Sequence, residues 1–470
     1  MQAARAAALT VLVAVGLRLV YGPGHLGYDA AWALEWGREA VAGSTPAFEG
    51  PGAPTPHPLA NAVSLALAPL GDSAFAVVMA LSWLSLAALS MLGFLLGRRL
   101  YGVWVGAAVA VVLLTRHLLV RETHQAVLDL PFLALVVGAL LAEVERPRER
   151  TLVPVLLCLA GLLRPEGWLL GLAWLIYAAP GHPRAQVLRW GALVVAAPLV
   201  WALWDLVVTG DPLWSLHGTQ DLAEELERPR AFDTALSAVP SYLRDALGDP
   251  IVWLGLAGAA GGLLSFYERS LLPAALAAAG MLGFLALGLA DLPLLIRYLL
   301  VPAVMLCLFS GLLAFGWTAL PRSDPAWRAW VAGGVACLLV VAAFVPRQAR
   351  ALSGAREQAV ITAAVQDDLR RLTRDPAFRD AAARCDTIVI PDARPRPLLA
   401  YWLDRSPGDI EIVPRWEGRE AAGLVLVYAE TELAERFSLT APIPPAGSGA
   451  LPAGGRHVAR NASWLVVERC

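Results

Sequence analysis

The stretch AFAVVMALSWLSLAALSMLGFLLGRR, residues 74–99, decides what kind of fold this chain adopts. Its apolar part, residues 74–97, contains no charged residue. A helix of about 20 residues is enough to cross roughly 30 Å of hydrocarbon. The two arginines that end the stretch, Arg98 and Arg99, are typical of the cytoplasmic end of a membrane span. We therefore predict a transmembrane helix over residues 74–97.

The composition of the whole chain points the same way. Of its 470 residues, 57% are hydrophobic and only 16% are charged, whereas soluble domains are about 45–50% apolar and about 25% charged. The formal net charge of −2 gives no reason to expect nucleic acid or a strongly charged partner. All 37 basic residues are arginine, which excludes a lysine Schiff base, a lysine nucleophile and a phosphate-binding-loop lysine.

Further apolar runs resemble residues 74–97 and raise the predicted number of crossings to about eleven. They are residues 6–21, 101–115, 126–142, 151–163, 167–180, 188–208, 251–266, 271–290, 298–318 and 329–345. The brief segment 57–71 opens with His-Pro, and we expect an interfacial or re-entrant helix there. The first run resembles a signal peptide, but Arg18 interrupts it and no small-x-small cleavage site follows, so we expect an uncleaved first span.

Short turns dense in arginine set the expected orientation. With the N-terminus inside, the Arg98–Arg99 turn and the turn at residues 145–150 face the cytoplasm. The chain from about residue 347 then lies outside. We therefore predict a multi-pass protein of the cell membrane, with a transmembrane domain over 1–346 and an extracytoplasmic domain over 347–470.

The C-terminal part has the pattern of a small α/β domain. Short buried strands are expected at 386–391, 410–413, 423–429 and 463–468, helices at 355–373 and 396–404, and a flexible loop at 442–455. No glycine-rich phosphate fingerprint accompanies these elements. Cys385 and Cys470 lie in this domain and could pair if it is outside the cell. No C-x-x-C or H-E-x-x-H pattern indicates a zinc or redox site.

On the predicted topology, the charged and polar residues that border the membrane gather at its outer face. They are Asp29, Glu35, His57, Arg121, Glu122, His124, Asp129, Arg164, Glu166, Arg297 and Tyr298. Charged groups at membrane depth are costly and usually face a cavity or a partner. Their common side predicts a site at the outer interface rather than a pathway through the centre.

Several of these residues belong to motifs that occur in order along the chain. The motifs are YDAAWALEWGREAVAGSTP (28–46), HPLAN (57–61), VLDLPFLAL (127–135), GLLRPEGWLL (161–170) and LIRYLLVPAVML (295–306). Over roughly residues 6–345 the series resembles the GT-C membrane glycosyltransferases that use polyprenyl-phosphate sugars. Their relatives include aminoarabinose transferases, protein O-mannosyltransferases and Rgt-type lipopolysaccharide glycosyltransferases.

The resemblance implies catalytic roles for two acids. Asp29 takes the place of the acid that begins the first large outer loop and acts as the base, and Asp129 takes the place of the acid that opens the fourth span. Many relatives have an acidic pair in the first loop, whereas here Ala30 follows Asp29. Glu35 could supply the second acid.

The resemblance also implies a set of substrate-binding residues. His57 stands in the basic position of its motif, Arg164 in the turn after the fifth span, and Arg297 and Tyr298 in the late motif. The remaining members expected at the substrate are Glu35, Arg121, His124 and Glu166.

The residue types suit the chemistry that the family performs. A carboxylate can take the proton of an acceptor hydroxyl as it attacks the anomeric carbon. Arginine offers planar, permanently charged donors to the phosphate that leaves. Because arginines can neutralise a lipid monophosphate, we expect no cofactor; a divalent metal is an open alternative that no motif supports. The expected function is transfer of a sugar, with inversion, from a polyprenyl-phosphate carrier in the lipid membrane to an extracytoplasmic glycan, lipid or protein.

Other interpretations stay open at this point. Asp129 could cap a helix N-terminus, and Arg164 and Arg297 could extend to lipid headgroups. Trp32 and Trp36 could form a sugar-stacking wall, a membrane-interface belt or ordinary packing. The alternative functions are a transporter or flippase, or a binding protein, for lipid-linked saccharides. A transporter should carry ionisable groups or broken helices near the middle of the membrane, and the predicted spans have few charges at their centres.

Overall fold

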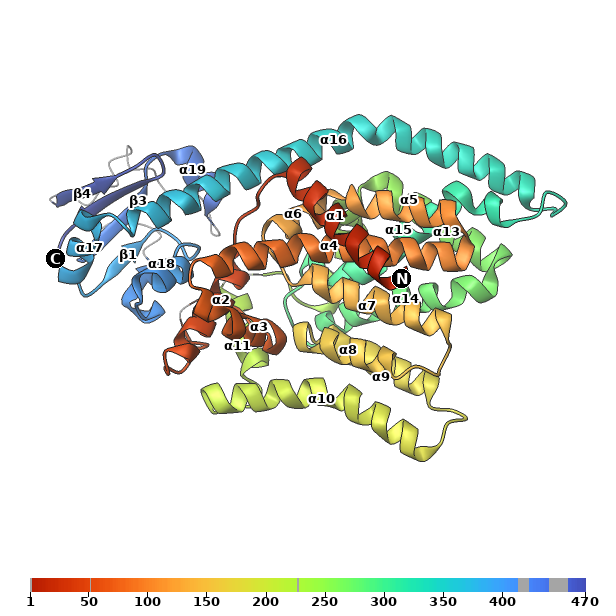
Figure 1. Cartoon of the computed structure of the whole chain (residues 1–470), viewed down its shortest axis with the longest axis horizontal. Helices are drawn as coiled ribbons and strands as arrows, with labels where there is room; N and C mark the ends of the chain where they lie inside the picture. Colours follow the sequence, from red (N-terminus) through yellow and green to blue (C-terminus); the bar gives the residue numbers. More distant parts are fainter. Residues whose placement is uncertain (1, 51, 226–227, 413–421, 439–454) are drawn as a thin grey trace. The chain divides into compact units, whose positions relative to one another are not determined.

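The computed structural model describes residues 2–50, 52–225, 228–412, 422–438 and 455–470. The chain divides into two compact units (Figure 1). Unit 1 comprises Met1–Gly22, His57–Ala60 and Val78–Ala355. Unit 2 comprises Pro23–Pro56, Asn61–Val77 and Arg356–Cys470. The division predicted between residues 346 and 347 stays a prediction.

Unit 1 is built from helices. Its α-helices are α1 (Gln2–Tyr21), α4 (Ser73–Tyr101), α5 (Val103–Leu114), α6 (His117–His124), α7 (Asp129–Glu145), α8 (Leu152–Leu163), α9 (Glu166–Ala178), α10 (Arg184–Thr209), α11 (Trp214–Glu225), α12 (Phe232–Leu247), α13 (Asp249–Ser265), α14 (Tyr267–Leu289), α15 (Leu300–Phe315) and the first part of α16 (Trp327–Leu372). The 3₁₀ turns η2 (Ile296–Leu299) and η3 (Gly316–Ala319) flank α15.

Every apolar run predicted as a crossing is helical, and the chain is a multi-pass membrane protein. Within the described residues, six helices are long and apolar enough to span a membrane: Ala4–Tyr21, Ser73–Tyr101, Arg184–Thr209, Tyr267–Leu289, Ile296–Ala319 and Trp327–Leu372. Two bent pairs, α5 with α6 and α12 with α13, raise the number to eight if each pair is one span.

The predicted number of about eleven counts each apolar run as one crossing, whereas helix length and composition support six to eight. Three of the runs form α7, α8 and α9, which have 17, 12 and 13 residues. Two others are halves of bent pairs, with angles of 54° for α5–α6 and 107° for α12–α13. An apolar run does not reveal where a helix ends or bends, so counting apolar runs and applying a helix-length criterion give different numbers of crossings.

Helix α15 is the centre of unit 1. All of its residues except Leu313 and Phe315 are buried. Helix α13 packs against it through glycines, since a Cβ on Gly258 would lie only 2.0 Å from the carbonyl oxygen of Phe309. Small residues let helix backbones approach closely and gain dispersion contacts where lipid offers no hydrophobic driving force.

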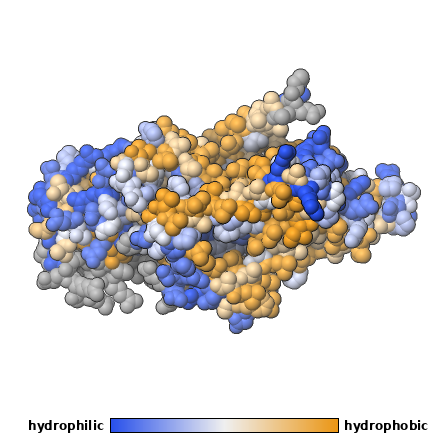
Figure 2. Space-filling view, turned by 90° about the horizontal axis from the view of Figure 1, so that it is seen from below, coloured by the Kyte–Doolittle hydropathy of each residue, from blue (hydrophilic) through white to orange (hydrophobic). Residues whose placement is uncertain are grey.

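Many large apolar side chains of unit 1 point outward instead. Leu19, Val207, Leu264 and Leu289 are each more than 70% exposed. Figure 2 shows apolar residues over much of the visible face. A soluble protein rarely exposes such an extended apolar area, and a lipid bilayer accounts for it.

Unit 2 contains a mixed five-stranded sheet in the order β2-β1-β3-β5-β4. Figure 1 labels its strands β1, β3 and β4. The strands are β1 (Ile388–Ile390), β2 (Ile410–Ile412), β3 (Leu424–Tyr428), β4 (Arg456–Arg460) and β5 (Trp464–Glu468). Strand β1 runs parallel to β2 and β3, and β5 runs antiparallel to β3 and β4. The other elements are α2 (Tyr28–Val41), α3 (Pro58–Leu67, from Asn61 on), η1 (Ala68–Leu70), the start of α4, the end of α16, α17 (Pro376–Arg384), α18 (Arg396–Leu403), η4 (Pro407–Asp409) and α19 (Thr431–Phe437).

The expected α/β character of the tail is confirmed. Four strands and the helix over 396–404 lie where the pattern predicts them, and residues 355–373 are the end of α16. Strand β4 was not predicted, because RHVAR is a mostly exposed edge strand without an apolar alternation. The predicted loop at 442–455 lies outside the described residues, apart from Gly455.

Residues from the first loop contribute to the interior of unit 2. Trp32 and Trp36 of α2 are 0% and 2% exposed, and Phe48 is 3% exposed. Their rings pack in series, with centroids 5.6 Å apart for the two tryptophans and 4.7 Å apart for Trp36 and Phe48. The two tryptophans are therefore packing residues.

Cys385 and Cys470 form a disulfide.

Candidate active site

Five of the predicted site residues form one charged cluster in unit 1. Asp129 is the first residue of α7, and Arg164 lies in the short turn from α8 to α9. Glu166 is the first residue of α9, and Arg297 and Tyr298 lie in η2, before α15. All five lie at helix ends, where the chain turns between apolar segments, so their polar groups meet without breaking a helix interior.

Arg164 is the centre of this cluster. Its Nη1 pairs with a carboxylate oxygen of Asp129. Its Nε and Nη2 donate to Oε1 of Glu166 at 3.2 and 2.7 Å. The guanidinium carbon lies 4.8 Å from the ring centre of Tyr298 and 5.6 Å from that of Phe132. Arg164 thus holds two carboxylates while its flat face contacts two aromatic rings, which is a use for which arginine is better suited than lysine.

These contacts decide whether Asp129 caps its helix and whether Arg164 extends to lipid headgroups. Oδ1 of Asp129 pairs with Arg164 and Oδ2 accepts no hydrogen bond within the described residues, so this side chain does not cap the start of α7. It is 1% exposed, and Arg164 is 5% exposed. Arg164 is therefore enclosed by protein and does not extend to lipid headgroups.

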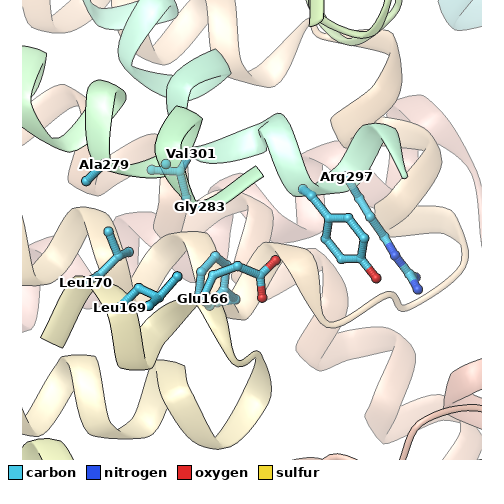
Figure 3. Close-up of a pocket in the computed structure, with 10 residues that line it drawn as sticks. Glu166, Leu169, Leu170, Ala279, Gly283, Arg297 and Val301 are labelled. Atoms are coloured by element: carbon cyan, nitrogen blue, oxygen red, sulfur yellow. The ribbon is translucent and has the colours of Figure 1, made fainter. Parts of the chain in front are cut away.

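A pocket opens beside the cluster (Figure 3). Its lining comes from α7, α9, α14, η2 and α15: Phe132, Glu166, Leu169, Leu170, Ala279, Gly280, Gly283, Arg297, Tyr298 and Val301. The empty space, part of which is open solvent, is about 340 Å³, and about 10 Å³ of it can hold the centre of a water-sized sphere. In Figure 3 the Glu166 carboxylate and Arg297 lie to one side of the pocket and Leu170 and Ala279 to the other. The pocket is therefore amphipathic, with a charged end and an apolar wall.

The charge balance of the cluster limits what it can bind. The formal charges of the two arginines and the two carboxylates sum to zero. The cluster can therefore bind an anion only if an arginine leaves its carboxylate partner or if a carboxylate is protonated. Arg297 faces the pocket directly, whereas Arg164 already contacts Asp129 and Glu166. Within the described residues, Oδ2 of Asp129 is buried and accepts no hydrogen bond. A buried acceptor without a donor suits a hydroxyl group or a water molecule.

Three other predicted residues of unit 1 have different surroundings. Arg121 pairs with its neighbour Glu122 at 2.9 Å and is partly exposed. His124 is 1% exposed, its Nε2 lies 2.9 Å from the Tyr21 carbonyl oxygen, and its ring packs on the edge of Trp83. His57 packs edge to face with Trp201, with ring centres 5.6 Å apart. None of the three is in the pocket lining.

The two predicted residues of the first loop lie in unit 2. Asp29 is in the first turn of α2 and is half-buried. Glu35 is 0% exposed and accepts hydrogen bonds from Arg38 Nε at 2.8 Å and Nη2 at 2.6 Å. Burial raises the pKa of Glu35 to about 7, against the opposing effect of Arg38. Glu35 therefore contributes to the packing of α2.

Sequence reasoning missed the apolar part of the site. Phe132 follows Asp129 by three residues on α7 and so lies on the same helix face, a spacing that could have revealed it. Gly280 and Gly283 on α14 and Val301 on α15 are small or aliphatic residues in apolar runs. Nothing in the sequence sets them apart from other lipid-facing or core positions.

Among the described residues, the group of three or more ligand side chains close enough to share an ion is Cys385, Glu468 and Cys470 in unit 2. Its two cysteines are joined as the disulfide, which removes their thiolates as ligands.

The fold and the cluster together define a helical membrane protein with an amphipathic pocket, and known structures share this fold. An Archaeoglobus fulgidus oligosaccharyltransferase in the apo form has 12% sequence identity and a TM-score of 0.53, covering 92% of this chain and 71% of that one. The same enzyme tethered by a disulfide to an acceptor peptide with the NVT sequon has 13% identity and a TM-score of 0.50, covering 87% of this chain and 63% of that one.

At this identity the likeness concerns the fold, and the chain spans about two thirds of the length of the archaeal enzyme. No family model matches the chain, and no curated protein matches it. The fold therefore resembles that of an archaeal oligosaccharyltransferase.

Proposed function

We propose that this protein is a membrane glycosyltransferase that moves a sugar from a polyprenyl-phosphate carrier to an extracytoplasmic glycan, lipid or protein. The observation that carries the proposal is the cluster of Asp129, Arg164, Glu166 and Arg297 at the charged end of an amphipathic pocket. A lipid-linked sugar phosphate has the same two parts, an anionic group and an apolar chain.

In this proposal the arginines stabilise the phosphate. The bond between the anomeric carbon and the phosphate oxygen breaks, and the electron pair leaves with the phosphate. Arg297 lines the pocket and receives this charge, while Arg164 is oriented by its two carboxylates. Preorganised cations that face a developing negative charge are usually the largest single contribution to such catalysis.

The acceptor hydroxyl attacks the anomeric carbon from the opposite side and loses its proton to a carboxylate. Asp29 takes this role by the resemblance of its motif, and inversion follows from the single displacement. Asp129, whose Oδ2 is a free acceptor within the described residues, is the second catalytic acid. The proposal assigns substrate contacts to Glu166, Arg297 and Tyr298 first, because they line the pocket.

Unit 2 is proposed to lie outside the cytoplasm. Disulfides persist in oxidising compartments and are rare in the cytosol, so the Cys385–Cys470 bond favours this side. The arginine-dense turns of unit 1 favour the same orientation. The donor would then reach the site from the outer leaflet of the cell membrane.

Purified protein and a defined polyprenyl-phosphate sugar would test the function directly. Asp29→Asn keeps the shape of the side chain and removes its basicity, so transfer should fall by roughly 10²–10⁴-fold, the usual contribution of a positioned general base. Donor binding should be retained. Asp380→Asn, at an exposed acid of the same unit, is the matched control and should transfer normally.

Normal turnover by Asp29→Asn would move the base elsewhere, with Asp129 as the next candidate. Binding of the donor without any transfer by the wild-type protein would instead favour a binding protein. Mass spectrometry of cell-envelope glycans from a deletion strain would identify the sugar and the acceptor.

One structural feature favours a second candidate, a transporter for lipid-linked saccharides. The helix breaks at α5–α6 and α12–α13 resemble the broken helices of transporters. Arg116 in the first break donates to the carbonyl oxygen of Leu247 in the second at 2.6 Å, and Gln348 donates to that of Thr115 at 2.5 Å. Movement of a labelled lipid-linked sugar across proteoliposomes, without transfer to any acceptor, would establish this function.

A further inference from the structure

A side chain from the C-terminal half of the chain clamps the backbone of the first loop in unit 2. The Leu26 N–H donates to Oε1 of Gln366 at 3.1 Å, and Nε2 of Gln366 donates to the Leu26 carbonyl oxygen at 2.6 Å. Leu26 is 3% exposed and Gln366 is 8% exposed. The amide therefore pairs with one backbone residue in both directions, away from competing water.

The clamp acts at the entrance to α2. Gly27 is the N-cap of this helix, and the N–H of Ala31 donates to its carbonyl oxygen at 3.0 Å. Asp29 lies in the first turn, between these two residues. Since Gln366 holds the residue before the cap, it sets the direction in which the helix and Asp29 begin.

A second contact braces the same turn. The Tyr28 hydroxyl donates to the carbonyl oxygen of Gly52 at 2.5 Å. Gly52 has a φ of +71°, and a Cβ there would lie 3.1 Å from that hydroxyl, so glycine suits the position. The loop that follows α2 thus folds back onto Tyr28, the first residue of that helix.

The far parts of the first loop are also joined to the C-terminal segment. Arg38, near the end of α2, pairs with Asp404. Asp72 pairs at 2.7 Å with Arg370 on α16 and also with Arg374, two residues after the end of that helix. The first loop is therefore fixed by the C-terminal segment at several points, and a local change at one point need not unfold it.

We propose that Gln366 is a positioning residue for Asp29, and that the C-terminal segment of unit 2 is the template that holds the first loop for transfer. This inference rests on the proposed function, in which Asp29 takes the proton of the acceptor. It gives the C-terminal segment a role in the reaction rather than in membrane insertion.

Three variants of α16 test the clamp. Gln366→Leu removes both hydrogen bonds, and kcat should fall at least tenfold while the KM for the donor changes less than twofold. Gln358→Leu is the matched control on the same helix, because the Gln358 amide donates to the Arg436 carbonyl oxygen at 2.7 Å and not to the first loop. Its kcat should match the wild-type value.

Gln366→Glu supplies a readout that a general loss of packing would not produce. The introduced carboxyl can accept from the Leu26 N–H in either state, but it can donate to the Leu26 carbonyl oxygen only when protonated. Burial favours the protonated form of a carboxyl group. The kcat of this variant relative to the wild type should therefore rise several-fold as the pH is lowered from 8 to 6.

Hydrogen exchange measured by mass spectrometry on the same proteins separates the clamp from the enzyme function. Amides near the start of α2 should exchange faster in Gln366→Leu and at the wild-type rate in Gln358→Leu. Unchanged exchange in Gln366→Leu, or an unchanged kcat with an active wild type, would overturn the inference. If amides near the start of α2 exchange faster in Gln366→Leu but the wild-type protein shows no transfer, the clamp is supported and the proposed function is overturned.

Discussion

Replacement of Arg164 with lysine is the most direct test of the charged cluster in unit 1. Arg164 pairs with Asp129 through Nη1 and with Glu166 through Nε and Nη2, the latter at 2.7 Å. A lysine ammonium keeps the charge but not the planar fork. The ammonium can approach one of the two carboxylates closely, and the other carboxylate stays buried with a weaker ion pair.

The size of the effect follows from these contacts. A hydrogen bond to a charged group contributes about 1.5–3 kcal/mol, and breaking a buried ion pair costs about 3–5 kcal/mol. Since lysine keeps one of the two pairs, Arg164→Lys should lower the free energy of unfolding by about 2–4 kcal/mol. Arg297→Lys should change it by less than about 1 kcal/mol, because Arg297 is half-buried at the pocket.

Thermal unfolding of the purified proteins and transfer from a polyprenyl-phosphate sugar distinguish the two arginines. Arg164→Lys should unfold at a lower temperature and lose transfer. Arg297→Lys should stay folded and transfer at least about tenfold more slowly, since it loses the bidentate contact with phosphate. Wild-type stability of Arg164→Lys would refute the assigned role of this cluster, and near-wild-type transfer by both variants would refute its role in phosphate binding.

Further predictions concern the pocket, the topology and the acid stability. Gly283→Ala places a Cβ 3.8 Å from Leu169, so it should keep the free energy of unfolding or raise it slightly, by about 0.5–1 kcal/mol. Titration with the donor should show weaker binding, and an unchanged affinity would place the lipid elsewhere. Reporter fusions after Arg347 and within 145–150 should report opposite sides of the membrane, and a common side would contradict the orientation. Partial burial alone would raise the pKa of Asp72, but Arg370 and Arg374 lower it below its ordinary value of 3.8. The loss of stability in Asp72→Asn should therefore be complete above about pH 4 and should disappear as the pH falls further. The same loss at pH 3 would contradict this.

The membrane class and most of the helices could be predicted from local sequence. Whether a run such as 74–97 is long and apolar enough to cross a bilayer depends on consecutive residues, which the sequence displays directly. The same holds for strands such as Leu424–Tyr428, which are short apolar runs between turn residues. The number of crossings could not be derived in this way, because bends such as the one between α12 and α13 depend on the packing around them.

The members of the charged cluster could be named from the order of the motifs, but their contacts could not. Asp129 and Arg164 are 35 residues apart, and only the packing of α7 against α8 and of α8 against α9 brings them together. The contacts of the described residues also show that Asp129 does not cap its helix and that Arg164 is buried away from the lipid surface. The apolar wall of the pocket has no local signal at all.

The sequence by itself determined that this chain is a multi-pass membrane protein with a small α/β segment, because hydrophobicity and its period are properties of neighbouring residues. The tertiary structure alone decided which distant residues meet. Leu26 and Gln366 are separated by 340 residues and form two buried hydrogen bonds, and the first loop shares a unit with the C-terminal segment. Such contacts form when two surfaces exclude water together, and neither surface is recognisable until the chain has brought both into contact.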